Sequence, residues 1–418
     1  MQAVVRYLIE FLVRDAGAAQ RVGYTSDPAE YARYALVVQP SGWLDQVAAP
    51  KRALLPDPFD FQGVPVLFGS PQITQIQGVC VVSADWVASA YYLLTRYEEL
   101  QNPIRDAHGR FPGRESLLSR LHWLDRPLVE AYSRQLRSLL RQAGIPLAPL
   151  RPGIVTLTHD IDSARRFHNL RSLLGGIRRR HWRLLHESLY GRDPYAEWEG
   201  ITRMDSALPW AKSRFFAHVA GRTGEAEDAA CIPLQPADWL QSRHLDWGIH
   251  FSARAARNQD FLLSENEQLS QAVGHPSVSS RFHYLLLPGP EGWRAVEEAG
   301  ITDDYSVGFA DVPGFRMGTC RPVRYIEPTT GRLSSTLTLH PLALMDVTLS
   351  DYARLPFAEA LTVAGDICRK ACEEGGEAVL LWHNSSLAEG ADGYHRSLYI
   401  QLLDSLALDG IGKPADSH

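Results

Sequence analysis

The chain has 418 residues, of which 45% are hydrophobic and 22% are charged. This composition is typical of a soluble globular protein, and the length predicts two domains. The formal net charge of −6 argues against general nucleic-acid binding, and the five scattered cysteines argue against a disulfide scaffold.

Residues 1–15 are predicted to form an amphipathic helix. Arg6, Glu10 and Arg14 recur at four-residue steps and place one charged stripe opposite an apolar face. This is not the uninterrupted apolar core of a signal peptide, and no apolar run approaches the ~20 residues that span a bilayer. We therefore expect a cytoplasmic protein without a transmembrane segment, whose membrane contact, if any, is peripheral.

The first 150 residues are predicted to form a small accessory α+β domain. After the opening helix we expect a strand at 35–38 and helices at 84–100 and 126–143, joined by proline-rich connections. Residues 144–153 contain three prolines and read as a linker. The predicted domains are therefore 1–150 and 151–418.

Beyond the linker, predicted strands alternate with predicted helices. The strands are 154–158, 214–219, 247–251, 283–287, 302–307, 342–348 and 378–382. The helices are 261–273, 292–299, 357–374 and 394–407. This alternation predicts a parallel α/β architecture, and about seven such units suit a closed barrel better than an open sheet.

Titratable residues stand where three of these strands end. Asp160 and Asp162 follow the first strand, His250 ends the third, and His383 follows the last. The two aspartates are spaced i, i+2 and so project to one side of a strand, where they repel each other unless a cation or proton lies between them. The pair suits metal binding and proton transfer, although a capping or turn-forming pair has the same spacing.

Short motifs in this region resemble those of the polysaccharide deacetylases of carbohydrate esterase family 4. They are Leu157–Asp162, Lys212–Phe216, Asp246–His250, Gly314–Arg316 and Leu380–Asn384. The resemblance covers roughly residues 152–410 and implies a distorted (β/α)7 barrel. Upstream, 91–99 and 106–111 resemble the N-terminal module of a two-domain bacterial subgroup often associated with surface-polysaccharide loci.

The resemblance implies a role for five residues. Asp160 would be the catalytic base, and Asp162 and His250 would bind a divalent metal, usually zinc. Arg316 would orient the base, and His383 would protonate the leaving amine.

The chain departs from the family pattern at one metal ligand. The family has a second histidine four residues after the first, and here that position is Arg254, whose guanidinium stays protonated and cannot bind a metal. Either another side chain completes the site or metal binding is weak or absent. His283 is our candidate third ligand, the alternatives being a substrate contact or an ordinary buried histidine.

Four residues are expected to contact the substrate. Asp346 lies in an apolar run and needs a partner, and Trp382 beside His383 offers a face for sugar stacking. Asn384 and Arg254 are also expected to contact the substrate. The alternative for Asn384 is a hydrogen bond to nearby backbone.

An arginine-rich segment follows the two aspartates. Its basic residues are Arg165, Arg166, His168, Arg171, Arg178, Arg179, Arg180, His181 and Arg183. They would clamp the phosphate of a lipid-linked or nucleotide-linked sugar, or touch an anionic membrane surface. The alternative is an ordinary solvated helix face.

The sequence thus predicts a hydrolase of carbon–nitrogen bonds other than peptide bonds. It would remove an N-acetyl or related acyl group from a carbohydrate, a surface-polysaccharide precursor, with a divalent metal. The first alternative is a non-catalytic carbohydrate-binding protein that kept the barrel and lost the metal. A glycoside hydrolase fits poorly, because its two carboxylates must flank the bond from opposed sides.

Overall fold

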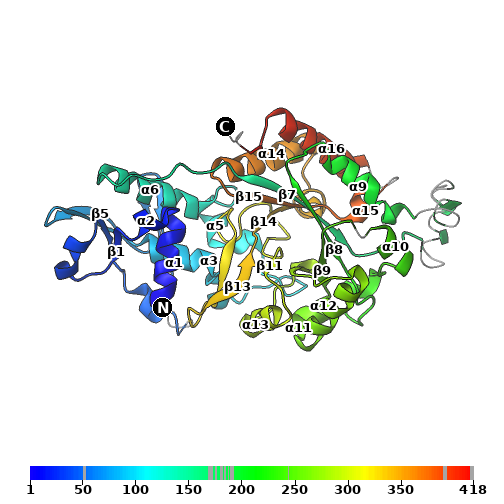
Figure 1. Cartoon of the computed structure of the whole chain (residues 1–418), viewed down its shortest axis with the longest axis horizontal. Helices are drawn as coiled ribbons and strands as arrows, with labels where there is room; N and C mark the ends of the chain where they lie inside the picture. Colours follow the sequence, from blue (N-terminus) through cyan, green and yellow to red (C-terminus); the bar gives the residue numbers. More distant parts are fainter. Residues whose placement is uncertain are drawn as a thin grey trace.

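The computed structural model describes residues 1–49, 53–167, 173–174, 177–178, 182, 185–186, 188, 193–242, 244–388 and 393–414. A small N-terminal sheet with its helices lies at one end of the molecule, and a large sheet flanked by helices forms the rest (Figure 1). None of the helices in these ranges is long and apolar enough to cross a bilayer.

The N-terminal sheet has four strands in the order β1-β2-β6-β5, and only the β5–β6 pair is antiparallel. The strands of this segment, with the separate β3–β4 hairpin, are β1 (Val22–Tyr24), β2 (Leu36–Val38), β3 (Phe59–Phe61), β4 (Val64–Val66), β5 (Gly69–Ile76) and β6 (Val79–Ala84). Its helices are α1 (Gln2–Val13), α2 (Ala16–Ala19), α3 (Trp86–Leu94), α4 (Glu98–Gln101), α5 (Leu117–Arg120) and α6 (Leu128–Gln142).

The opening helix, the strand at 35–38 and the helix at 126–143 are confirmed by α1, β2 and α6. The single helix expected at 84–100 is wrong, because Arg96 adopts a left-handed φ of 55° that separates α3 from α4.

The large sheet has nine strands in the order β12-β13-β11-β10-β9-β8-β7-β15-β14. All neighbours are parallel except β12 and β13. The strands are β7 (Ile154–Ile161), β8 (Lys212–Ala217), β9 (Trp247–Phe251), β10 (Ser279–Phe282), β11 (Asp303–Asp304), β12 (Val323–Ile326), β13 (Leu333–Leu339), β14 (Leu342–Met345) and β15 (Glu377–Leu381).

This sheet curls without closing. Strands β12 and β14 are its edges, and the start of β14 approaches the chain after β11, where the Leu342 amide donates to the Val307 carbonyl at 3.0 Å. The closed seven-stranded barrel is therefore wrong in strand count, because the β12–β13 hairpin is inserted before β14. A small apolar cluster fills the curl: Phe216, Leu285, Tyr305, Ala310, Leu342, Met345, Val379 and Leu381.

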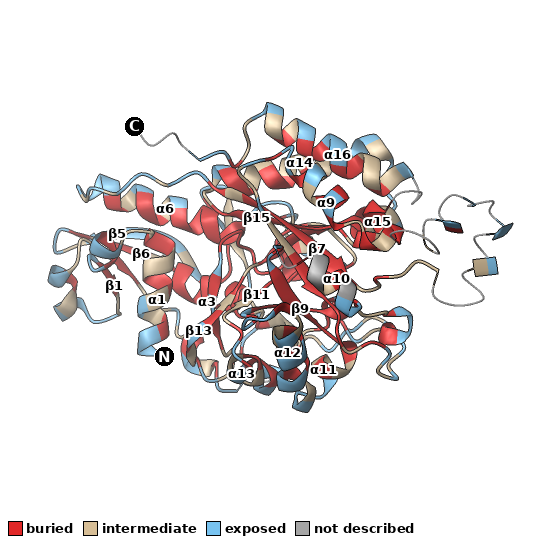
Figure 2. Ribbon diagram, turned by 45° about the vertical axis from the view of Figure 1, so that its right-hand side comes forward, coloured by how far each residue is buried: buried red, intermediate tan, exposed pale blue. Residues whose placement is uncertain are grey.

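Helices cover the outside of the curl and turn their buried faces to it (Figure 2). They are α9 (Trp198–Asp205), α10 (Pro236–Gln241), α11 (Ala253–Arg257), α12 (Asp260–Val273), α13 (Pro290–Glu298), α14 (Phe357–Glu373), α15 (Asn384–Leu387) and α16 (Gly393–Leu408). The four helices expected from the sequence are confirmed by α12, α13, α14 and α16.

The fourth predicted strand is misplaced. Strand β10 ends at Phe282, and a 3-10 turn (His283–Leu285) follows. Tyr284 and Leu285 have φ values of 58° and 54°, which are strained for residues with a side chain. The turn directs His283 away from the strand and into the mouth of the curl.

The N-terminal segment and the large sheet share one apolar core, which runs from Val4 to Leu406. Two ion pairs cross this boundary in buried surroundings. Arg321 Nε lies 2.8 Å from Glu130 Oε1, and Arg316 Nη2 lies 2.9 Å from Glu99 Oε2. The division into domains 1–150 and 151–418 stays a prediction.

A charged histidine ties three strands together at the end of the sheet opposite the mouth. His340 Nδ1 lies 2.6 Å from Glu377 Oε2, and its Nε2 lies 3.0 Å from Asp303 Oδ1. Since carboxylates only accept, both ring nitrogens must carry protons. Burial disfavours the charged ring, but the bonds to Asp303 and Glu377 raise the pKa of His340 to about 9.

Because the pKa of His340 is raised on folding, its contribution to stability should be complete below its unfolded pKa near 6.5 and lost as the pH rises through 9. We expect His340→Gln to lower the free energy of unfolding by about 2–3 kcal/mol at pH 6 and by much less at pH 9.5. Urea denaturation of both proteins at the two pH values measures this. An equal loss at both pH values would show that the histidine is uncharged.

Candidate active site

Five of the predicted residues meet at the mouth of the curled sheet. Asp160 is in β7 and Asp162 follows it, His250 is in β9, His283 follows β10, and His383 follows β15. Parallel strands end at the same edge of a sheet, so these residues converge although they are far apart in the chain. Asp162 is at the centre, and its Oδ1 lies 3.1 Å from His250 Nε2 and 3.7 Å from His283 Nε2.

The backbone fixes the tautomer of His250. Its Nδ1 lies 3.1 Å from the carbonyl oxygen of Arg281, to which it can only donate. In the neutral ring, Nε2 therefore carries a lone pair that points at the Asp162 carboxylate. Both Asp162 Oδ1 and His250 Nε2 are buried and have no hydrogen-bond partner among the described residues.

Asp228 fixes the tautomer of His283 in the same way. His283 Nδ1 donates to Asp228 Oδ1 at 2.9 Å, which leaves the Nε2 lone pair facing Asp162. Asp228 lies in the loop after β8 and also accepts from the Ala253 amide at 3.0 Å. Carboxylates that hold the far nitrogen of a histidine in this way are typical second partners of metal-binding histidines.

The three facing atoms fit a divalent cation. Burial alone would raise the pKa of Asp162, but His283, His250 and His383 lower it far below its ordinary value. Among the described residues, Asp162, His250 and His283 form one of two groups whose ligand atoms lie within 4.8 Å of one another. A cation between these three atoms would be in reach of each of them.

The second group combines His283 with His218, Asp228 and Cys231. His218 Nε2 donates to the Gly221 carbonyl at 3.0 Å, and burial followed by the neighbouring histidines His283 and His250 lowers the pKa of His218 to about 4. His283 can enter this group only through Nδ1, which already donates to Asp228. The hydrogen bonding therefore favours the group around Asp162.

Arg281 holds Asp160, and the expected contact from Arg316 is wrong. Arg281 Nη1 lies 2.9 Å from Asp160 Oδ1 and 2.7 Å from Thr158 Oγ1, and the arginine is fully buried. Arg316 instead forms two bonds to Glu99, each 2.9 Å long. Arg281 pairs with His250 in the register of β10 against β9, and this register could not be predicted from the sequence.

Asp346 positions His383. His383 Nδ1 donates to Asp346 Oδ1 at 2.8 Å, and the His383 amide donates to Asp346 Oδ2 at 3.0 Å. Burial disfavours the imidazolium, but Asp346 and then Asp162 raise the pKa of His383 to about 10. Its Nε2 lies 3.9 Å from Asp162 Oδ2, so a protonated nitrogen faces the candidate cation site.

These groups line a cavity of about 300 Å³ that opens to solvent. Besides Asp160, Asp162, His283 and His383, it is lined by Arg110, Tyr284, Leu285, Met345, Val347, Asp351, Tyr352, Leu381, Ser385 and Ser386. Arg110, which the sequence analysis missed, comes from the N-terminal segment, and its Nη2 lies 2.9 Å from the Tyr352 hydroxyl.

None of the four residues expected to contact the substrate lines this cavity. Trp382 is fully buried and donates to the His395 carbonyl, and fully buried Asp346 is occupied by His383. The Asn384 side chain donates to backbone carbonyls, as its alternative reading allowed. The Arg254 guanidinium lies 3.9 Å from the centre of the Phe261 ring, outside the cavity lining.

The arginine-rich segment is described only in part. Arg165 Nη2 lies 2.8 Å from Asp238 Oδ2, and the Arg166 amide donates to Asp193. His168, Arg171, Arg179, Arg180, His181 and Arg183 lie outside the described residues. The phosphate clamp proposed for this segment stays a prediction.

A family model described as "Family of unknown function (DUF7033)" matches residues 7–144. The chain has no match among curated proteins.

The solved structures similar to this chain include the following three. A candidate polysaccharide deacetylase from Mycobacterium smegmatis is 14% identical with a TM-score of 0.39, over 63% of this chain and 86% of that one. A family 4 carbohydrate esterase from Streptomyces lividans is 11% identical with a TM-score of 0.30, over 62% and 91%. A polysaccharide deacetylase from Bacillus cereus is 13% identical with a TM-score of 0.31, over 64% and 94%. With TM-scores below 0.5, these likenesses carry no argument about activity.

We expect His283→Ala to lower the affinity for Zn²⁺ about 100-fold or more, because it removes one of three ligand atoms. Asp228→Asn should lower it about 10-fold, because the tautomer of His283 is no longer fixed. Competition titration with a chromophoric chelator measures both. The control is His275→Ala, which removes an exposed histidine whose only polar contact found is local. Equal affinity of all four proteins would remove His283 from the metal site.

Proposed function

We propose that the protein is a metal-dependent deacetylase that removes an N-acetyl or related acyl group from a carbohydrate. The observation that supports this most directly is the convergence of Asp162 Oδ1, His250 Nε2 and His283 Nε2 beside a second carboxylate and a protonated imidazole. A ligand set, a base and an acid are what amide hydrolysis requires.

Asp162, His250 and His283 would hold the metal, and zinc suits two imidazoles and a carboxylate. When bound, the metal would polarise the acyl carbonyl and lower the pKa of water. His283 would take the place of the histidine that Arg254 replaces in the family pattern. The retained alternative, a carbohydrate-binding protein without activity, rests on that replacement.

Asp160 would act as the general base. Its Oδ1 is held by Arg281 and its Oδ2 lies 3.7 Å from His250 Nε2, on the lining of the cavity. The buried guanidinium restricts the rotation of this carboxylate. Asp160 can therefore take a proton from a water that lies above Asp162.

His383 would act as the general acid. Asp346 fixes its ring so that the proton on Nε2 faces the cavity, and the amine leaving group needs that proton when the C–N bond breaks. The carboxylate and the imidazole lie on different strands at the same mouth, so both reach one bound acyl group.

The substrate class follows from the sequence resemblance and the cavity. A volume of about 300 Å³ with the rings of Tyr284 and Tyr352 on its wall suits one sugar unit better than a long polymer segment. We therefore propose a surface-polysaccharide precursor as the substrate.

Acetate release tests the proposal. We expect the zinc-loaded protein to release acetate from N,N′-diacetylchitobiose or UDP-N-acetylglucosamine, and Asp160→Asn to lower kcat about 1,000-fold while Zn²⁺ stays bound. A protein that binds these sugars but releases no acetate with Zn²⁺, Co²⁺ or Ni²⁺ would support the binding protein instead. Reducing ends without acetate would indicate a glycosidase.

The pH profile tests the role of Asp346. Replacing Asp346 by Asn removes the charge that raises the pKa of His383, so the general acid loses its proton at a lower pH. We expect Asp346→Asn to lower kcat and to move the alkaline limb of the kcat profile to lower pH. An unshifted limb with a lower kcat would mean that Asp346 acts only through packing.

A further inference from the structure

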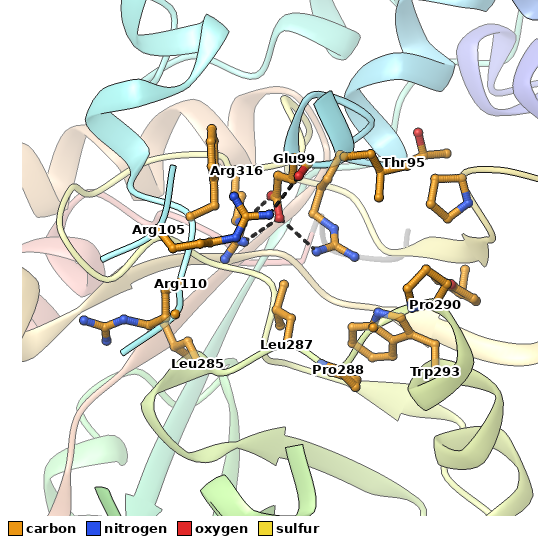
Figure 3. Close-up of a pocket in the computed structure, with 17 residues that line it drawn as sticks. Thr95, Glu99, Arg105, Arg110, Leu285, Leu287, Pro288, Pro290, Trp293 and Arg316 are labelled. Atoms are coloured by element: carbon orange, nitrogen blue, oxygen red, sulfur yellow. Dashed lines mark hydrogen bonds and ion pairs between the residues drawn. The ribbon is translucent and has the colours of Figure 1, made fainter. Parts of the chain in front are cut away.

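A second cavity of about 240 Å³ lies beside the active site, between the N-terminal segment and the large sheet. Figure 3 shows Glu99, Arg105 and Arg316 on one side of it and Pro288 and Trp293 on the other. One wall is therefore charged and the other mostly apolar.

The lining carries an excess of positive charge. Arg96, Arg105, Arg110 and Arg316 line the cavity, and Glu99 is the one carboxylate among its lining residues. Burial opposes ionisation of Glu99, but Arg316 and Arg96 hold its pKa below the ordinary value, so it is charged. Even when Asp106, the partner of Arg110 outside the lining, is counted, two positive charges remain uncompensated.

Three donor atoms of the lining residues are buried and have no partner among the described residues. They are Arg96 Nε, Trp293 Nε1 and the Tyr325 hydroxyl. Trp293 is 1% and Tyr325 is 2% exposed, so bulk water does not reach them freely. Guanidinium and indole N–H groups can only donate, and a buried donor gains free energy from an acceptor. A guest rich in acceptor atoms would therefore match this lining.

The two cavities are adjacent and share lining residues. Arg110 and Leu285 line both of them. Arg110 donates to the Tyr352 hydroxyl on the active-site wall and to the Tyr284 carbonyl, and Tyr284 follows the candidate metal ligand His283. A ligand that fills both cavities would pass Arg110.

We propose that this second cavity binds a phosphate or diphosphate group that is attached to the sugar in the active site. This inference rests on the proposed function for the identity of the sugar. The uncompensated charge of two matches a phosphate dianion, and phosphate oxygens accept from several planar guanidinium groups at once. A ligand with a single carboxylate would leave one positive charge of the lining uncompensated and some of its N–H and O–H donors without an acceptor.

Titration with inorganic pyrophosphate tests the site. The protein is first treated with a chelator, because a bound metal would itself bind the probe. We expect Tyr325→Phe to weaken pyrophosphate binding about 10-fold, since it removes one donor to a charged acceptor. It should leave the free energy of unfolding unchanged or slightly higher, because that hydroxyl has no partner in the protein.

Arg105→Gln is the second variant. Arg105 is exposed and donates only to nearby backbone carbonyls in the interactions found, so the variant should fold and bind pyrophosphate at least 10-fold more weakly. The matched control is Arg33→Gln, because Arg33 is exposed and remote from both linings. If neither Tyr325→Phe nor Arg105→Gln changes the affinity, or if the protein does not bind pyrophosphate, the proposal is overturned and the arginines are structural.

Two further probes identify the carrier. Tighter binding of geranyl diphosphate than of pyrophosphate would indicate a lipid carrier, and tighter binding of UDP would indicate a nucleotide carrier. Equal affinities would assign the cavity to the phosphates alone. Pyrophosphate binding without acetate release would support the phosphate site and reject the deacetylase activity. Acetate release without pyrophosphate binding would support the deacetylase activity and reject the phosphate site.

Discussion

Two imidazole lone pairs and one carboxylate oxygen face each other in a buried space, and much of the mouth of the sheet serves to hold them there. The Arg281 carbonyl accepts a hydrogen bond from Nδ1 of His250, and Asp228 accepts one from Nδ1 of His283. Neither ring can turn its N–H inward without losing a buried hydrogen bond. Both Nε2 atoms are therefore held toward Asp162, where a divalent cation would be in reach of two imidazoles and a carboxylate.

The sheet explains how the site could be predicted at all. Aspartates and histidines at strand ends converge in any parallel sheet, so Asp162, His250 and His383 could be placed together from the predicted strands. His283 could not, because it was predicted at the start of a strand and the structure places it after β10. Arg281 could not be chosen over Arg316 in this way. That choice depends on the register of β10 against β9, in which Arg281 is the direct neighbour of His250.

Other differences between expectation and structure have local physical causes. Trp382 precedes His383, and successive residues of an extended chain face opposite ways, so the indole packs outward against Tyr399 at 5.0 Å while the imidazole faces the mouth. The β12–β13 hairpin was missed although Leu337 and Leu339 alternate with Thr336 and Thr338, a pattern typical of a strand. The contact of Asp346 with His383 and that of Arg110 with Tyr352 join residues far apart in the sequence. No local sequence pattern predicts such contacts.

The N-terminal segment supplies more than packing. It shares the apolar core, and through Arg110 it contributes a side chain to both cavities. Both candidate ligand cavities are therefore lined by residues from the N-terminal segment and from the rest of the chain. A fragment without the first 145 or so residues would expose part of the shared apolar core and would leave Arg316 and Arg321 without their carboxylate partners, so it is not expected to keep this fold.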